Sequence, residues 1–196
     1  LSNAQHPDMV VLVGDIMDYE SRFAEMEHIE DDLQQLKAPL GVYVVNGNHE
    51  YRANRFAKYR WLAKTGTTLL IDSVVQPDSS FYLIGRDDYV NKKRKALHTL
   101  MADIDTTKPI IVLDHQPWSF TEMTMNGVDL GLHGHTHNGQ LWPYPLVMKL
   151  IYECPYGYHK KGPVQFYVSS GIGIAGPPYR VGTVSEMIVL HIRFAN

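Results

Sequence analysis

Four short segments of the sequence carry the side chains that metal ions prefer. They are GDIMD at 14–18, NGNHE at 46–50, DHQP at 114–117 and HGHTH at 133–137. Together they offer carboxylate oxygen, amide oxygen and imidazole nitrogen, and none of them contains a cysteine. A mixed oxygen and nitrogen set of this kind suits Mn, Fe, Zn, Co or Ni better than Mg or Ca. The four segments therefore indicate a divalent metal site.

Each segment taken alone has an ordinary structural explanation. Asp15 could cap a helix, GNH is common in turns, and His115 could be a core histidine whose nitrogens find partners. The pair His135 and His137 is harder to explain in this way, because two imidazoles two residues apart can reach one centre. All four segments follow an apolar run, and this shared context favours the metal site.

The apolar runs before these segments predict strands that are buried on both faces. They cover residues 9–14, 41–45, 109–113 and 128–132. In open α/β sheets, ligands bind at the carboxyl ends of the strands. We therefore expect the four polar segments to meet at one edge.

The remaining elements follow from periodicity and breakers. Apolar residues recur every three or four positions over 23–36, which predicts a helix that Pro39 ends. The other expected elements are helices at 50–64 and 91–103, short strands at 68–71, 73–76 and 80–85, an irregular segment at 141–163, and strands at 164–170 and 186–194. Alternating strands and helices, followed by more strands, predict a layered α/β sandwich. No linker divides residues 1–196, so we expect one domain.

The composition is that of a globular domain, with 44% hydrophobic and 20% charged residues. The net charge of −3 argues against a nucleic-acid partner, and with it against a nuclease. The single cysteine, Cys154, excludes an internal disulfide. No apolar run reaches the ~18 residues of a membrane span, so we expect no membrane segment in this chain and a soluble domain.

With these motifs, the chain resembles the calcineurin-like metallophosphoesterases, and within them the bacterial branch whose last motif reads GHTHxGQ. GDIMD, GNHE at 47–50, the histidine in LDHQP and GHTH at 134–137 match four of the family's five ordered motifs. Similarity extends to NAQHPD at 3–8 and YVSSGIG at 167–173. The resemblance implies a metallophosphoesterase-like αββα layered sandwich. The first motif, Asp-x-His, occurs nowhere in the 196 residues, so we expect this sequence to be N-terminally incomplete and to lack its first strand.

The resemblance also implies a role for each matching residue. Asp15 bridges two metals in the complete protein, and Asn48, His115 and His135 complete the second metal site. His137 belongs to the first site, whose other two ligands would be the absent Asp and His. His49 would donate a proton to the leaving group or stabilise its charge.

Other polar residues are expected beside the ligands. Asp18 and Glu50 would support the ligands from behind, and His133 would have a supporting, substrate-facing or purely structural role. A GRDD segment supplies three candidates for substrate contact, with a surface turn held by an ion pair as the other explanation: Arg86, Asp87 and Asp88.

The implied activity is hydrolysis of a phosphodiester or pyrophosphate-type bond by a metal-bridging hydroxide. The expected substrate is a small-molecule or lipid phosphoester, and manganese is the favoured metal. With two first-site ligands absent, we expect one well-held metal and impaired activity in this chain. The alternative is a non-catalytic metal- or phosphate-binding module or scaffold.

Two further expectations concern assembly and location. A missing first strand would leave an open sheet edge, and such edges invite pairing into a homo-oligomer. Similar bacterial proteins carry upstream membrane segments, so we expect the full-length protein to be anchored through a missing N-terminal region. The aromatic stretch from Trp142 to Tyr158 could line an apolar substrate or be ordinary loop and core packing.

Overall fold

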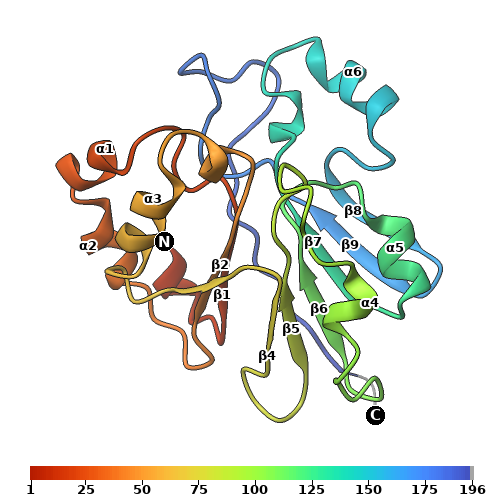
Figure 1. The fold of residues 1–196 in the computed structure, drawn as a ribbon. Coiled ribbons are helices and arrows are strands. Elements are labelled where there is room, and N and C mark those ends of the chain that lie inside the picture. The colour runs from red at the N-terminus through yellow and green to blue at the C-terminus, as the bar shows by residue number, and fades with distance from the viewer. Residues whose placement is uncertain (195–196) are drawn as a thin grey trace.

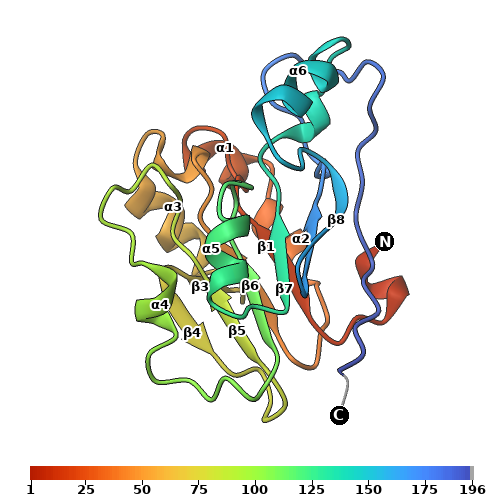
Figure 2. The ribbon, with the colours of Figure 1, turned by 90° about the vertical axis from the view of Figure 1, so that its right-hand side faces the viewer.

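Runs of β-branched and aliphatic residues form two sheets that pack face to face between layers of helices (Figures 1 and 2). The computed structural model describes residues 1–194. The first sheet has three parallel strands in the order β1-β2-β3, which are β1 (Val10–Val13), β2 (Val42–Val45) and β3 (Thr68–Leu70).

The second sheet has six strands in the order β4-β5-β6-β7-β9-β8. The four inner strands run parallel, and β4 and β8 pair antiparallel at the two edges. The bounds are β4 (Ser73–Val75), β5 (Tyr82–Gly85), β6 (Ile110–Leu113), β7 (Leu130–His133), β8 (Gly157–Lys161) and β9 (Val164–Val168).

Helices cover the outer face of each sheet (Figure 1). The first sheet carries α1 (Ser21–Met26), α2 (Ile29–Gln34) and α3 (Arg55–Leu62), and the second carries α4 (Leu97–Leu100) and α5 (Phe120–Met125). A sixth helix, α6 (Tyr144–Ile151), projects from one end of the molecule, and three 3₁₀ turns lie at Ser2–Gln5, His49–Tyr51 and His137–Gly139. The expected αββα sandwich is confirmed.

Three apolar cores lie between the four layers, and β6 shows how one strand serves two of them. Ile111 and Leu113 pack in the core between the sheets, whereas Ile110 and Val112 pack in the core beneath α4 and α5. The third core joins the first sheet to its helices. A strand that is covered on both faces has a continuous apolar sequence, and for this reason β6 could be predicted from the sequence.

The helices are shorter than their periodicity predicts. The expected helix over 23–36 is broken at His28, whose backbone is left-handed with φ 53° and starts α2 as a new element. The expected helix over 50–64 starts only after Asn54, whose side chain accepts a hydrogen bond from Ala57 N. Local capping and backbone conformation, to which periodicity is blind, set these ends.

Three other predicted elements were wrong in part. Asn91 accepts a hydrogen bond from Lys93 N as a cap would, but only a turn follows it, and α4 starts at Leu97 and covers four residues. Residues 141–163 contain α6 and β8 rather than irregular chain. Residues 186–194, expected as a strand, carry no strand assignment in the described structure. A strand requires a hydrogen-bonded neighbour, and this segment instead packs through single contacts such as Phe194 on Phe81.

The free edge of the first sheet and the lengths of the helices bear on the expectations about assembly and membranes. Within residues 1–194, β1 pairs with β2 and with no strand on its other side. No helix in that range is long and apolar enough to cross a bilayer, and the longest, α3 and α6, have 8 residues each. The predicted homo-oligomer through an open edge stays a prediction.

Candidate metal centre

The four polar segments follow β1, β2, β6 and β7, and they converge where the two sheets meet. Two bonds join segments that are far apart in sequence: the His115 ring lies with Nδ1 2.6 Å from Val13 O, and Gly134 N donates to His115 O at 2.9 Å. The strand ends are therefore tied to one another.

Asp15 lies at the centre of this meeting point. Its Oδ2 is 3.0 Å from His115 Nε2 and 3.8 Å from His49 Nε2, and its Oδ1 accepts a hydrogen bond from His49 N at 2.9 Å. Ligand atoms of Asp15, His115 and His135 all lie within 4.8 Å of one another. Three strand ends therefore direct one carboxylate and two imidazoles to a common point.

Asn48 extends the cluster from the β2 loop. Its Oδ1 is 2.8 Å from His135 Nδ1. His135 and His137 have left-handed backbones with φ 71° and 50°, and such conformations turn the chain sharply. The structure thus brings together Asp15, Asn48, His115 and His135, with His49 beside them, whereas His137 lies outside the 4.8 Å group.

The donor set fits a divalent cation. His115 Nε2 approaches Asp15 without hydrogen-bond geometry, and His137 Nδ1 has no partner at all, although both atoms are buried. Buried polar atoms are usually paired, so unpaired ring nitrogens at a carboxylate suggest a ligand. One carboxylate, one amide oxygen and imidazoles form the set that transition-metal ions accept.

Two close glycine contacts let the β1 and β2 loops touch. A Cβ at Gly14, which has φ 82°, would lie 2.6 Å from His115 Nδ1 and 2.7 Å from Gly47 N. A Cβ at Gly47 would collide with the Asp15 side chain. Both positions require glycine because any side chain would force Asp15 away from Asn48.

Mutual attraction sets the charge state of Asp15 and His115 in the metal-free chain. Burial favours the uncharged carboxyl, but contact with His115 and the hydrogen bond from His49 N hold the pKa of Asp15 well below its usual range. Burial also opposes the charged imidazole, yet Asp15 and the Val13 carbonyl raise the pKa of His115 to about 9. The two groups form an ion pair that an incoming cation must break.

Two further candidate ligands, His135 and His137, are held in the neutral form. Burial, together with the charge of His115, lowers the pKa of His135 to about 4. Burial and the nearby Arg180 lower the pKa of His137. A neutral imidazole has a free lone pair, so both rings are ready to bind a cation at neutral pH.

His49 is oriented by Asp18. Its Nδ1 lies 2.7 Å from Asp18 Oδ1, and Arg52 donates to the same oxygen at 2.6 Å. This contact directs Nε2 toward Asp15. Burial lowers the pKa of His49, while Asp15 opposes that effect.

Glu50 holds the β1 and β2 loops together from behind. It is fully buried, and its carboxylate accepts four backbone N–H bonds, from Asp15 and Gly47 at Oε2 and from Ile16 and Met17 at Oε1. Burial raises the pKa of Glu50, but a proton on either oxygen would face two donor groups, so the geometry requires the carboxylate. The two ligand loops therefore behave as one body.

Lys58 is a supporting residue that the sequence reasoning missed. It is 0% exposed, and Nζ donates to Met17 O at 3.1 Å and to His49 O at 2.5 Å. Its place in the sequence carried a signal: it lies three and four residues before Trp61 and Leu62, on the buried face of α3. A lysine on a buried helix face needs buried acceptors, and the loop carbonyls supply them.

The three polar side chains of the GRDD segment are buried and engaged with other residues of the protein. Arg86 is 1% exposed and donates to Glu122 Oε2 at 2.5 Å and to Lys95 O at 2.9 Å. Arg86 is thus engaged with Glu122, whose side chain is 33% exposed, and its predicted contact with a substrate stays a prediction. The alternative, a surface turn held by a local ion pair, does not describe Arg86 either, because the residue is buried and Glu122 lies 36 residues away.

Asp87 and Asp88 are buried acceptors. Asp87 takes hydrogen bonds from Asn46, Tyr51 and Asn91 side chains, at 2.8, 2.5 and 2.8 Å. Asp88 accepts from Gln116 and from the backbone of Val90, and burial raises its pKa. Both connect loops around the site, and neither is open to a substrate.

His133 has a structural position. It is 1% exposed, its Nδ1 lies 2.6 Å from Asp114 O, and its ring packs against Phe120 and Phe166. Burial lowers its pKa to about 4. Because side chains alternate along a strand, His133 points into the helix-facing core while the next residues turn toward the cluster.

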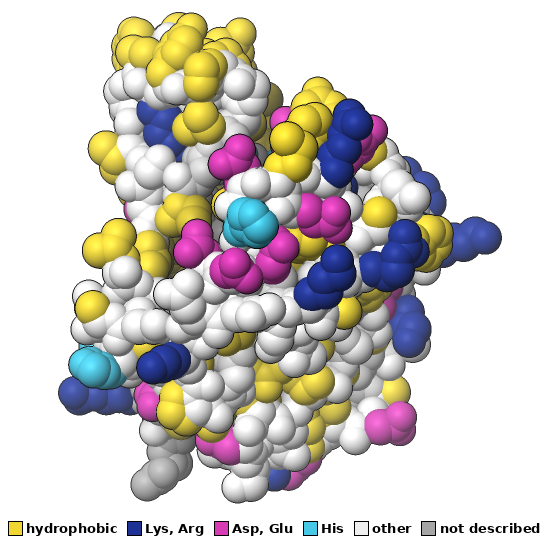
Figure 3. Space-filling view, turned by 90° about the vertical axis from the view of Figure 1, so that its left-hand side faces the viewer, with side chains coloured by type: hydrophobic (Ala, Val, Ile, Leu, Met, Phe, Trp, Pro, Cys, Tyr) yellow, Lys and Arg dark blue, Asp and Glu magenta, His cyan; other side chains and the backbone are white. Residues whose placement is uncertain are grey.

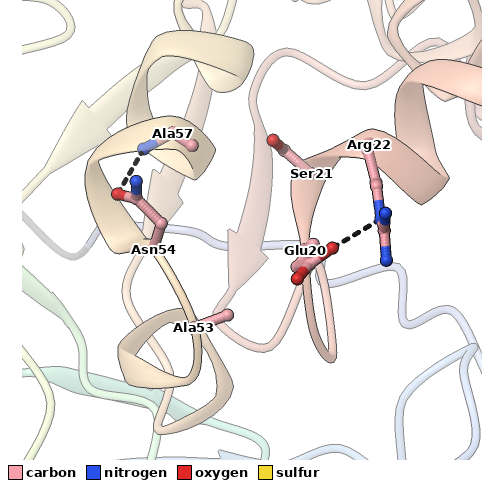
Figure 4. A pocket seen from close by; sticks show the side chains of 6 residues that line it. All are labelled: Glu20, Ser21, Arg22, Ala53, Asn54 and Ala57. Atoms are coloured by element: carbon pink, nitrogen blue, oxygen red, sulfur yellow. Dashed lines mark hydrogen bonds and ion pairs between the residues drawn. The ribbon is translucent and has the colours of Figure 1, made fainter.

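A shallow hollow adjoins the loops that follow Asp18 and Arg52. It measures about 340 Å³ and is bounded by the start of α1 and the start of α3, with an ion pair between Glu20 and Arg22 on one side and the Asn54 cap on the other (Figure 4). None of the residues that line this hollow belongs to the ligand cluster.

Comparison with known proteins identifies the family. The family profile described as calcineurin-like phosphoesterase matches residues 1–139. The chain is 32% identical to an uncharacterized metallophosphoesterase of Campylobacter jejuni over 97% of this chain and 52% of that protein, and 31% identical to one of Aquifex aeolicus over 96% and 74%.

A vertebrate relative is similar too. A protein of Danio rerio named a transmembrane protein with metallophosphoesterase domain is 30% identical over 94% of this chain and 46% of its own length. The chain spans about half the length of several curated relatives it matches, and no solved structure matches it. Metallophosphoesterases bind divalent metals, in agreement with the ligand cluster. The profile match and these relatives show that the chain belongs to the calcineurin-like phosphoesterase family.

Proposed function

We propose that the chain is a metal-dependent hydrolase of phosphodiester or pyrophosphate-type bonds, with manganese as its preferred ion. The observation that carries this proposal is the placement of Asp15, His115 and His135 ligand atoms within 4.8 Å of one another. Asn48 would complete the set of four, and His137 with Asp15 would contribute to a second ion. The chemistry that such ions supply, when bound, is neutralisation of phosphoryl charge and activation of water.

The chain's own residues orient the reaction. Asp18 holds Nδ1 of His49, which leaves Nε2 as the atom facing the cluster. A proton moved to the leaving oxygen would pass through His49 Nε2. Glu50 and Lys58 fix the backbone on both sides of this histidine, so its orientation is set by buried contacts.

The arrangement of cations supports a diester or pyrophosphate-type substrate. Arg86 is committed to Glu122, and the guanidinium beside His49 is that of Arg52. A phosphodiester carries less charge per phosphorus than a monoester dianion, so it needs fewer cationic side chains. The substrate class expected from the resemblance, a small or lipid phosphoester, is kept in this proposal.

The test measures metal content and turnover together. Chain loaded with Mn²⁺ is analysed for bound metal and for hydrolysis of bis(4-nitrophenyl) phosphate and of 4-nitrophenyl phosphate. We expect one firmly held ion per chain, slow hydrolysis, and a preference for the diester. The Asp15→Asn variant loses both metal and activity, and the matched control His98→Asn, on an exposed histidine of α4, retains them.

Three other results would contradict the proposed hydrolase, its assigned site or its expected metal content. Firm metal binding without turnover above the chelated chain overturns the hydrolase and favours the non-catalytic metal-binding module. Turnover that survives Asp15→Asn overturns the assigned site. Two firmly held ions with rapid turnover would contradict the expected effect of the missing Asp-x-His motif.

A further inference from the structure

Helix α6 is apolar, yet it packs against little of the protein. Its sequence is YPLVMKLI, and none of its residues is buried. Leu150 is 88% exposed and the neighbouring Trp142 is 61% exposed. Exposed apolar surface that is concentrated in one place marks an interaction site.

A second exposed segment lies beside α6. Residues 171–184 expose Ile172 and Tyr179, at 74% and 58%. Figure 3 shows hydrophobic side chains gathered at the apex of a projection, and Figures 1 and 2 place α6 and this segment together at that end. We call α6 with Trp142 and residues 171–184 the apolar tip.

Buried polar contacts hold the apolar tip in one arrangement. Gln140 is 6% exposed, donates to Ala175 O at 2.8 Å and accepts from Ala175 N at 2.7 Å. Trp142 N donates to Val181 O at 2.9 Å. The exposed side chains are therefore presented on a fixed frame.

The apolar tip is built directly onto the metal centre. Its first end follows the turn that contains His137, and Arg180 donates to His137 O at 2.9 Å. Tyr152 directly follows α6, and its ring centroid is 6.3 Å from that of His135. The base of the tip therefore adjoins the candidate ligands.

The charge of the tip differs from that of the whole chain. The chain has 21 acidic and 18 basic residues, but residues 138–152 and 170–185 contain no Asp or Glu. The charged residues of these two stretches are Lys149 and Arg180. Arg180 is bonded inward to backbone carbonyls, so the exposed Lys149 is the positive charge that the tip presents on an overall negative protein.

We propose that the apolar tip docks on the surface of an anionic lipid bilayer. A helix of 8 residues spans about 12 Å, too short to cross a membrane but suited to lie in the interface. Tryptophan and tyrosine beside leucine and isoleucine are typical of interfacial segments. Positive charge at the tip complements anionic headgroups. In combination with the proposed hydrolase, on which this step rests, docking makes a membrane lipid phosphoester the substrate.

Vesicle binding tests the docking without any need for turnover. The chain is mixed, in EDTA, with vesicles of phosphatidylcholine alone or with added phosphatidylglycerol, and the bound fraction is measured by sedimentation. We expect binding to the anionic vesicles that weakens with salt. Leu150→Glu should weaken it at least about tenfold, because burial of one leucine is worth that factor or more, and Lys149→Glu should weaken it on anionic vesicles.

The matched control is Met125→Glu, which places the same charge on an apolar residue that is 81% exposed at the end of α5. It should bind vesicles as the unaltered chain does. Circular dichroism and thermal melting confirm that each variant is folded. No binding to anionic vesicles, or equal loss in Leu150→Glu and Met125→Glu, overturns the proposal. A dimer that Leu150→Glu dissociates, without vesicle binding, assigns the tip to a second copy instead. Because metal binding is measured separately, failure here leaves the proposed hydrolase standing.

Discussion

Substitution of Glu50 by glutamine tests whether one buried carboxylate fastens the two ligand loops. Each Glu50 oxygen accepts two backbone N–H bonds, at 2.8 and 2.7 Å for Oε2 and at 2.9 and 3.2 Å for Oε1. Glutamine keeps one oxygen and replaces the other by an NH₂ group. In either orientation two N–H groups lose their acceptor and face a donor instead.

The expected loss follows from the bonds removed. Hydrogen bonds to a charged group contribute about 1.5–3 kcal/mol each, so two of them amount to about 3–6 kcal/mol. That is a large part of the roughly 5–15 kcal/mol that stabilises a domain. We expect Glu50→Gln to lower the free energy of unfolding by this amount and to weaken Mn²⁺ binding, since Asp15 and Asn48 are carried by the two loops.

Urea unfolding of the metal-free chain, followed by tryptophan fluorescence, measures the effect. Trp61 is 1% exposed in the same core as Met17, so its emission reports on this region. The control is Glu27→Gln, on an exposed glutamate after α1. If the two variants unfold at the same urea concentration with the same slope, the carboxylate does not hold the loops and the reasoning is refuted.

Three further predictions concern the metal centre and its surroundings. His135→Ala should weaken Mn²⁺ binding at least about 100-fold, since loss of a direct ligand exceeds the effect of losing an outer contact; calorimetric titration with unchanged affinity would remove His135 from the ligand set. Because the pKa of His115 is raised to about 9, this ring is protonated at neutral pH and must release its proton to bind a metal. Mn²⁺ affinity should therefore rise about tenfold per pH unit up to that pKa, and calorimetry in buffers of different ionisation heat should show about one proton released; no release would contradict the ion pair with Asp15. Arg86→Met should cost about 1.5–3 kcal/mol of stability because it removes a charged hydrogen bond to Glu122, which is one-third exposed, while Mn²⁺ affinity stays unchanged; a stable variant with weaker metal binding would return Arg86 to the site.

The strands and the metal ligands could be predicted because both depend on local pattern. Buried strands such as Ile110–Leu113 read as continuous apolar runs, and the polar residues after them can only lie at the strand ends. The direction of a side chain was harder to predict. His133 and His135 stand two residues apart in one motif, yet the first ends a strand facing the helical core and the second has a left-handed backbone, with φ 71°.

Features that depend on a partner far away in the chain could not be predicted from local sequence. The sequence predicts a substrate contact or a surface turn for Arg86, because Glu122, 36 residues away, gives no local signal. The segment 186–194 has strand composition, but strand formation needs a neighbour that composition does not reveal. Lys58 did carry a local signal, its place on the buried face of α3, but the sequence does not reveal its acceptors, which are the carbonyls of Met17 and His49.

The guanidinium of Arg180 joins residues 171–184 directly to the backbone of His137, in addition to the bonds that Gln140 and Trp142 make with this segment. It bonds the carbonyl of His137 and also those of Ser170 and Gly173, at 2.9, 2.8 and 2.6 Å. A displacement of residues 171–184 therefore reaches the backbone of a candidate ligand through one side chain. Occupancy at either end would then bias the other, and reciprocity requires the two affinities to change by the same factor.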